Sequence, residues 1–297
     1  MNPAHCATAA RLRDDPLVGT AAPARRWLLV EYSAGWATHA LQSRLIPPRV
    51  GARLEALARS RGDRVLLIRR HGRRRAGGPQ AWAVVDNDGR QQWGTWHAGP
   101  DLEHAADAFA GDVIPSGPQH PLLLVCAHGR HDTCCALRGR PVAEALAERW
   151  PEATWECSHV GGDRFAANLV VLPDGAYYGN LSASSAVPVV EAHLAGTVTP
   201  AHLRGLSTEP PVVQAAIVAA HEQLGPGGAR DLVGDTTTAV GADTWRVRLA
   251  GGGALPGVVE ATVSRERRPP AKLTCRAAGE AAAYAYVVSD LRVPTNG

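Results

Sequence analysis

The sequence of 297 residues contains no long apolar run. No window approaches the roughly eighteen consecutive apolar residues that a membrane-spanning helix needs, so no such helix is predicted. The first segment, MNPAHCATAARLRDDPLVG, also lacks the apolar core of a secretory signal. We therefore expect a cytoplasmic protein that makes no contact with a membrane.

The chain also carries little net charge, with a formal value of +3 at pH 7. An excess this small does not predict a polyanionic partner, and we expect no binding to nucleic acid. One dense basic run, from Arg69 to Gly78, is more typical of a solvated hairpin loop than of a phosphate contact. The apolar share of 45% and charged share of 20% are those of a globular protein with ample material for a core.

No internal repeat is visible, and the length suits two modest domains or one large domain. Residues 1–115 are predicted to form an N-terminal α/β region that ends at the Pro- and Gly-rich loop from Ile114 to Pro121. The strands and helices of this region are predicted from alternating and helical apolar periodicity, respectively. The predicted strands are 25–32, 63–70, 80–88 and 90–98, and the predicted helices are 35–45, 52–62 and 101–111.

Residues 116–205 are predicted to form a second unit in the order strand, helix, strand, strand, strand, helix, which fits a small thioredoxin-like sheet. Its predicted strands are 122–126 and 153–159 and a hairpin within 165–181, and its predicted helices are 141–150 and 187–196. Residues 206–297 are predicted as a helix followed by a small antiparallel β extension. The segments of that extension are 244–251, 257–266, 271–278 and 282–293. The predicted fold class is therefore α/β (α+β).

Four of the six cysteines and three of the twelve histidines fall in two short pieces, CAHGRHDTCC (126–135) and CSHVGGDRF (157–165). In a reducing compartment such cysteines are more often metal ligands or redox thiols than disulfides. Cys126 ends a predicted strand, and Cys157 and His159 end another. Two adjacent loops would bring these ligands to one point, and thiolates with imidazoles suit zinc, copper or iron–sulfur centres.

Other interpretations compete at single positions. A lone Cys157 is compatible with simple core packing, and His128 and His131 with a surface loop. Cys134 and Cys135, placed in the loop before the predicted helix, cannot easily both bind one metal, so one is expected to be spare. The chain lacks the C-x-x-C pair typical of thiol redox enzymes. Taken together, the spacing favours a metal or cluster site over a thiol redox site or no chemistry.

The segments CAHGRHDTCCALRGRPV and WECSHVGGDRFAANLVVLPDGAYYG resemble the sucrase/ferredoxin-like family, as does DPLVGTAAPARRWLLVEYSAGWATHAL. The resemblance covers about residues 5–200 and implies a thioredoxin-like ferredoxin domain with a [2Fe-2S] cluster. It also implies one-electron transfer with an unidentified redox partner protein. The cysteine ligands of eukaryotic relatives correspond to Cys126 and Cys135, and their first histidine ligand corresponds to His159. Their second histidine corresponds to Asp163.

The fourth ligand is therefore open, with Cys157 preferred and Asp163 and Cys134 as alternatives. Cys157 is preferred because thiolate is the usual ligand of such clusters. Gly161 and Gly162 are expected to let the backbone approach the cluster. Arg164 is expected either to balance the charge of the cluster or to lie in solvent.

No catalytic residue is predicted, because no spacing singles out the pair of acids that sugar hydrolysis requires. An electron-transfer protein or a component of an oxidoreductase is expected instead. The alternative functions are a metal-free thiol-disulfide redox protein on a thioredoxin-like scaffold and a structural zinc module. The electron donor, the acceptor and the oligomeric state are left open.

Overall fold

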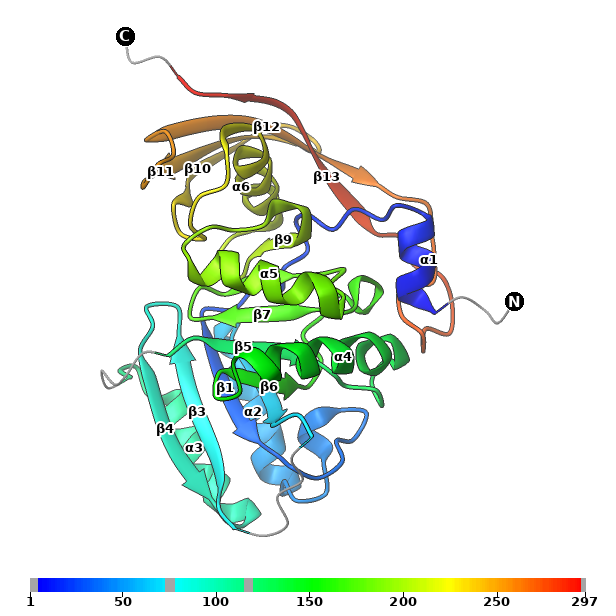
Figure 1. The fold of residues 1–297 in the computed structure, drawn as a ribbon, viewed down its shortest axis with the longest axis vertical. Coiled ribbons are helices and arrows are strands. Elements are labelled where there is room, and N and C mark those ends of the chain that lie inside the picture. The colour runs from blue at the N-terminus through cyan, green and yellow to red at the C-terminus, as the bar shows by residue number, and fades with distance from the viewer. Residues whose placement is uncertain (1–4, 73–77, 115–119, 295–297) are drawn as a thin grey trace.

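The computed structural model describes residues 5–72, 78–114 and 120–294 of the chain. This part contains six α-helices and two β-sheets, one of which is a small antiparallel sheet near the C-terminus (Figure 1). The predicted mixed α/β class is confirmed. No helix among these residues combines the length and apolar character needed to cross a bilayer.

The large sheet has nine strands in the order β4-β3-β1-β2-β6-β5-β7-β8-β9. Most of its strands are runs of Val, Leu, Ile and Trp that are buried along nearly their whole length, as expected for strands covered by other elements. β2 pairs antiparallel with β6, so the predicted N-terminal and middle regions contribute to one sheet. The strands are β1 (Arg26–Glu31), β2 (Arg64–Arg69), β3 (Gln80–Asp86), β4 (Gln91–Trp96), β5 (Leu122–Cys126), β6 (Thr154–Cys157), β7 (Leu169–Leu172), β8 (Ala176–Tyr178) and β9 (Leu203–Leu206).

Four helices pack on this sheet. α2 (Pro48–Arg61) and α3 (Leu102–Ala110) bury Leu54 and Phe109 in one apolar cluster with side chains of β1 to β4. α4 (Thr133–Arg149) and α5 (Ala183–Leu194) bury apolar side chains in a second cluster with β5 and β7. The predicted helix at 35–45 is reduced to a single 3-10 turn, Ala40–Gln42.

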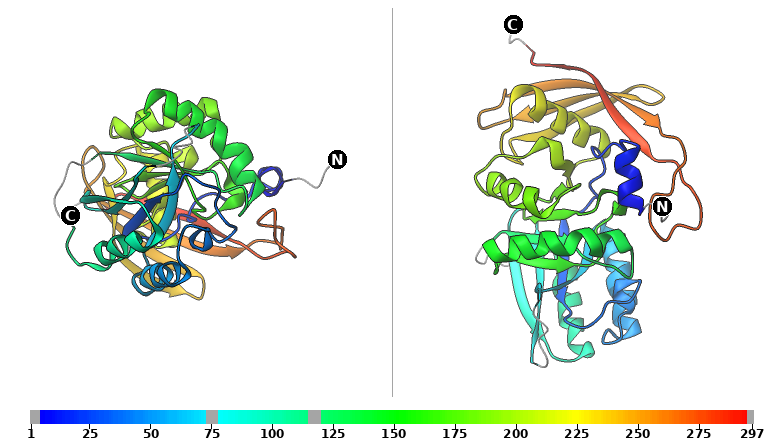
Figure 2. Two further views of the ribbon diagram at one scale, coloured as in Figure 1. Left: turned by 90° about the horizontal axis from the view of Figure 1, so that it is seen from below. Right: turned by 45° about the vertical axis from the view of Figure 1, so that its right-hand side comes forward.

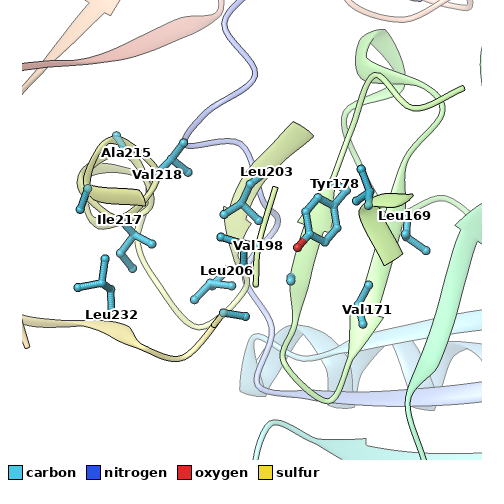
Figure 3. Packing of buried hydrophobic residues seen from close by; sticks show 14 of the residues in the cluster. Leu169, Val171, Tyr178, Val198, Leu203, Leu206, Ala215, Ile217, Val218 and Leu232 are labelled. Carbon is cyan, nitrogen blue, oxygen red and sulfur yellow. The ribbon is translucent and has the colours of Figure 1, made fainter. Parts of the chain in front are cut away.

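The second sheet has the order β10-β11-β12-β13 and is antiparallel throughout. It packs on α6 (Pro211–Leu224), whose apolar side chains belong to the cluster that also holds β7, β8 and β9. Figure 3 shows this continuity, with Ile217 and Leu232 on one side of β9 and Tyr178 and Leu169 on the other. The strands are β10 (Leu232–Gly241), β11 (Thr244–Gly251), β12 (Val258–Arg267) and β13 (Tyr284–Arg292).

Two predictions in the C-terminal part need correction. Residues 271–278 form no strand but lie in the loop that joins β12 to β13, where an isolated bridge links Ala271 to Ala281. β10 was not predicted, because after Leu232 its residues are exposed and show no buried face. Its β-branched threonines nevertheless suit an edge strand.

The start of α4 also differs from the prediction, which placed a loop up to residue 140. α4 begins at Thr133, because the Asp132 side chain accepts a hydrogen bond from the backbone N–H of Cys134 at 2.8 Å and caps the helix. Pro141 therefore lies inside the helix rather than in its first turn. Cys134 and Cys135 consequently belong to the first helical turn.

Some predictions fall partly outside the described residues, namely the basic run from Arg69 to Gly78 and the loop from Ile114 to Pro121. Within the first of these, Arg69 forms an ion pair with Glu156 at 2.7 Å. The division of the chain at residues 115 and 205 stays a prediction.

Candidate metal centre

The predicted ligands gather at one end of β5 and β6. These neighbouring strands are parallel, and Cys126 is the partner of Cys157 in their register. The N-terminal half of α4 packs closely on this end, because Gly139 lacks a side chain. A Cβ at Gly139 would collide with the carbonyl oxygen of Cys126. The first turn of α4 is thereby held over the last residue of β5.

Three of the four predicted ligands meet here. One ligand atom each of Cys126, Cys135 and His159 lies within 4.8 Å of the other two. Both cysteines are buried, whereas the side chain of His159 keeps 28% of its surface exposed. A buried pair of thiols with one imidazole at the solvent edge is a donor set for a soft or borderline metal.

Asp163 completes this group on the side of Cys135 and His159. The Cys135 thiol donates a hydrogen bond to Oδ1 of Asp163 at 3.1 Å, and the same oxygen lies 2.8 Å from Nδ1 of His159. Gly161 and Gly162 precede Asp163 with φ values of +94° and +77°, a left-handed backbone that favours glycine. The two glycines therefore turn the chain so that Asp163 points back at the cysteines.

Two further histidines line the group. The ring of His131 stacks on that of His159 with centroids 3.8 Å apart, and its Nε2 lies 3.8 Å from Oδ2 of Asp163. His128 is buried, and its Nε2 lies 2.7 Å from the carbonyl oxygen of Ala37. His128 is thus a buried residue that ties the loop after β5 to the segment after β1.

The ionisation of these residues follows from their contacts. Interaction with the neighbouring Cys135 thiol holds the pKa of Cys126 well below its usual value, although burial opposes this. The same interaction raises the pKa of Cys135. Burial disfavours a charged His159, but the Asp163 carboxylate and the Cys126 thiolate outweigh it and raise the pKa of His159 to about 9. The pKa of Asp163 is lowered, because the contact with His159 outweighs burial.

The remaining predicted site residues lie outside this group. Cys157 is fully buried beside Cys126 in an apolar cluster that includes Ile68, and burial raises its pKa. Cys134 contacts Cys275 instead, with their sulfur atoms 3.4 Å apart. Arg164 lies with its Nε 3.5 Å from Asp15 and its guanidinium over the ring of Phe165.

Sequence reasoning missed Arg204, which is almost completely buried in β9. Its guanidinium donates hydrogen bonds to the carbonyl oxygen of Gly161 and to Oδ1 of Asn168, both at 2.9 Å. A Cβ on Gly162 would collide with it. Within the described residues no acid forms an ion pair with Arg204, and burial lowers its pKa to about 10. The signal in the sequence was a lone arginine within the apolar segment HLRGL.

Two thiols and one imidazole would supply three of the four ligands of an iron–sulfur cluster. Thiolate is the usual ligand of such clusters, and imidazole is the known substitute. The fourth position is less typical, since the side chain that contacts both Cys135 and His159 is the carboxylate of Asp163.

Comparison with known protein families gives a match. The model of the sucrase/ferredoxin-like family matches residues 17–205, which is more than half of the chain. No curated protein and no solved structure matches. The matched range includes the strands β1 to β8 and every residue of the group described above.

Proposed function

Because the chain belongs to the sucrase/ferredoxin-like family, we propose that it binds a [2Fe-2S] cluster and acts in one-electron transfer. The observation that carries this proposal is the convergence of Cys126, Cys135 and His159 within 4.8 Å. The resemblance assigned these three residues to the cluster, and they come from three separate segments of the chain. The whole arrangement lies within the range that the family model matches.

For the fourth ligand the proposal moves from Cys157 to Asp163. Neither residue belongs to the group of Cys126, Cys135 and His159, but Asp163 contacts both Cys135 and His159. Chemistry argues in the other direction, because thiolate is a far more common cluster ligand than carboxylate. Cys157 therefore remains the alternative, and the two assignments are separated by experiment below.

When bound, a [2Fe-2S] cluster supplies a centre that gains or loses a single electron. The chain would contribute two thiols that are shielded from solvent and the partly exposed imidazole of His159. Arg204 places a positive charge behind the loop of Gly161, where it would offset the negative charge of a thiolate-bound cluster. A redox partner protein would approach from the side of His159, the most exposed of the proposed ligands.

The first test is an absorption spectrum of anaerobically purified protein, with iron, sulfide and zinc measured on the same sample. The proposal predicts visible absorption bands and about two irons and two sulfides per chain. The Cys126→Ser and Cys135→Ser variants should lose both, whereas Cys275→Ser should retain them, since Cys275 lies outside the group. A protein that stays colourless after reconstitution with iron and sulfide would refute the proposal.

The fourth ligand is identified by comparing Asp163→Ala with Cys157→Ala. If Asp163 binds, its variant should lose most of the iron while the Cys157 variant keeps it. The opposite pattern would assign Cys157. Asp163→His serves as a further check, because it restores the pair of histidines found in eukaryotic relatives and should keep the cluster.

One observation favours a second candidate function, thiol-disulfide chemistry. The Cys126 and Cys135 sulfur atoms lie within 4.8 Å of each other, as a pair of thiols that forms a disulfide requires. A colourless, metal-free protein that forms a stoichiometric and reversible Cys126–Cys135 disulfide would establish this function. Zinc without sulfide, lost on replacing Cys126 or Cys135, would instead indicate a structural zinc module at this site.

A further inference from the structure

A second group of metal-binding side chains lies outside the proposed cluster site. It consists of Cys6, Cys134, Cys275 and Asp132, which each bring one ligand atom within 4.8 Å of the others. Cys6 begins α1 (Cys6–Leu12), Asp132 and Cys134 form the start of α4, and Cys275 lies in the loop between β12 and β13. Three segments from the two ends and the middle of the chain therefore meet at this point.

The three sulfur atoms are close to one another but not bonded. Sγ of Cys275 lies 3.4 Å from Sγ of Cys134 and 3.5 Å from Sγ of Cys6. A disulfide would bring two of them to about 2.05 Å. In a tetrahedral zinc site, with Zn–S bonds of about 2.3 Å, the sulfurs stand roughly 3.8 Å apart. The observed spacing is close to this value.

Asp132 holds the group in place and adds a carboxylate to it. It is completely buried, and it accepts hydrogen bonds from the backbone N–H of Cys134 at 2.8 Å and of Cys275 at 2.6 Å. The thiol of Cys6 lies 3.6 Å from Oδ2 of the same carboxylate. No ion pair joins Asp132 to a cation in the part of the chain that the structure describes. In the described structure, the negative charge of this buried carboxylate therefore has no cation beside it to balance it.

Apolar packing between these segments is limited. Among the residues that the structure describes, the apolar cluster around the thiols consists of Cys6, Ala7, Cys134, Ala166 and Cys275, so it buries few carbon atoms. α1 has seven residues, and a helix of this length is marginal by itself. The loop from 268 to 283 has no strand of its own, yet Figure 1 and the right-hand view of Figure 2 show it against α1.

We propose that Cys6, Cys134, Cys275 and Asp132 bind one Zn²⁺ ion, which fastens α1 and the loop between β12 and β13 to the start of α4. Three thiolates with one carboxylate form a four-coordinate donor set of the kind that structural zinc accepts. Cys134 and its neighbour Cys135 point into different groups, so this site is separate from the proposed cluster. The proposal does not depend on the identity of the group bound at Cys126 and Cys135.

The test measures zinc and iron per chain in the full-length protein produced with added zinc and dialysed against a weak chelator. Wild type should retain about one zinc ion per chain. Cys6→Ser and Cys275→Ser should each lower the retained zinc at least tenfold, while most of the iron is retained. The matched control is the Cys126→Ser/Cys135→Ser double variant, which should lose iron and keep zinc.

A second measurement does not depend on how well the variants fold. Apo-protein titrated with Co²⁺ should develop sulfur-to-cobalt charge-transfer bands and the intense visible bands of a tetrahedral site, and one equivalent of Zn²⁺ should abolish them. Hydrogen exchange of α1 and of the 268–283 loop should slow when zinc is added. Wild type without retained zinc or cobalt bands would overturn the proposal. So would zinc that is lost from the double variant but kept by Cys6→Ser, or a stoichiometric disulfide between two of the three cysteines.

Discussion

Arg204 shows how a single buried charge depends on its surroundings. Its guanidinium donates to oxygens of Thr20, Gly161 and Asn168, all on segments next to the candidate metal centre. Replacing it by methionine would leave these buried acceptors without a donor. We expect Arg204→Met to lower the free energy of unfolding by about 3–5 kcal/mol, measured by urea denaturation. The control Arg149→Met removes an arginine whose side chain is 63% exposed and should cost much less; an equal loss in both variants would contradict this role for Arg204.

The choice of histidine at position 159 carries a second prediction at this scale. Imidazole ligands raise the reduction potential of a [2Fe-2S] cluster relative to thiolates, because they are neutral. His159→Cys should therefore lower the potential by on the order of 100 mV, as measured by redox titration. His97→Ala, at an exposed histidine, is the control. An unchanged potential in the His159 variant would remove this residue from the ligand set.

Which residues of the candidate site could be predicted depends on whether they lie in a short sequence motif. The convergence of Cys126, Cys135 and His159 could be expected because they lie in two compact motifs. The second cysteine group was missed because Cys6 and Cys275 are 269 positions apart, and no spacing rule relates them. Arg204 was missed because an arginine inside a strand has no motif around it.

At the scale of elements, α4 is positioned by a glycine. Gly139 allows the helix to approach the end of β5 so closely that a Cβ would strike the Cys126 carbonyl oxygen. We expect Gly139→Ala to destabilise the protein by about 1–3 kcal/mol and to lower its iron content, because Cys135 would move away from Cys126. Thermal unfolding and iron analysis measure both effects.

Gly35→Ala is the matched control for this substitution. Gly35 is exposed, and no atom lies within 4 Å of a Cβ built on it. This variant should therefore behave like wild type. A Gly139 variant with unchanged stability and iron content would show that α4 is not held by this close approach.

Most buried elements could be predicted from apolar periodicity, and the exceptions have physical causes. β1 to β8 were found because burial forces continuous or alternating apolar residues. The start of α4 was placed too late, because Gly139 and Pro141 are helix breakers by propensity, whereas the Asp132 cap and packing on β5 outweigh them. Residues 271–278 were assigned to a strand from composition alone, while the structure places them in the loop that carries Cys275.

At the scale of the whole molecule, Asp174 joins the middle and C-terminal parts. Its carboxylate lies 3.0 Å from Nε2 of His193 and 2.6 Å from Nε of Arg230, which precedes β10. These contacts outweigh burial and lower the pKa of Asp174. A lowered pKa means that the stabilisation is complete above the unfolded-state pKa of about 3.9 and is lost as the pH falls through the folded-state pKa.

Asp174→Asn should therefore reduce the free energy of unfolding at pH 7 by about 1–2 kcal/mol. The difference from wild type should shrink as the pH is lowered below about 4. Urea unfolding at several pH values between about 3 and 7 measures it. A difference that is constant across this range would mean that the charge of Asp174 contributes nothing to stability.

Cys134 and Cys135 are consecutive residues of one helical turn, yet they face two different groups. Each bound metal would favour the same conformation of that turn, so the two binding equilibria are linked. Linkage is reciprocal: the factor by which zinc tightens cluster binding equals the factor by which the cluster tightens zinc binding. A cell short of zinc would then also hold less of this protein in its iron-loaded form. The supply of zinc would in this way affect how much of the protein carries iron.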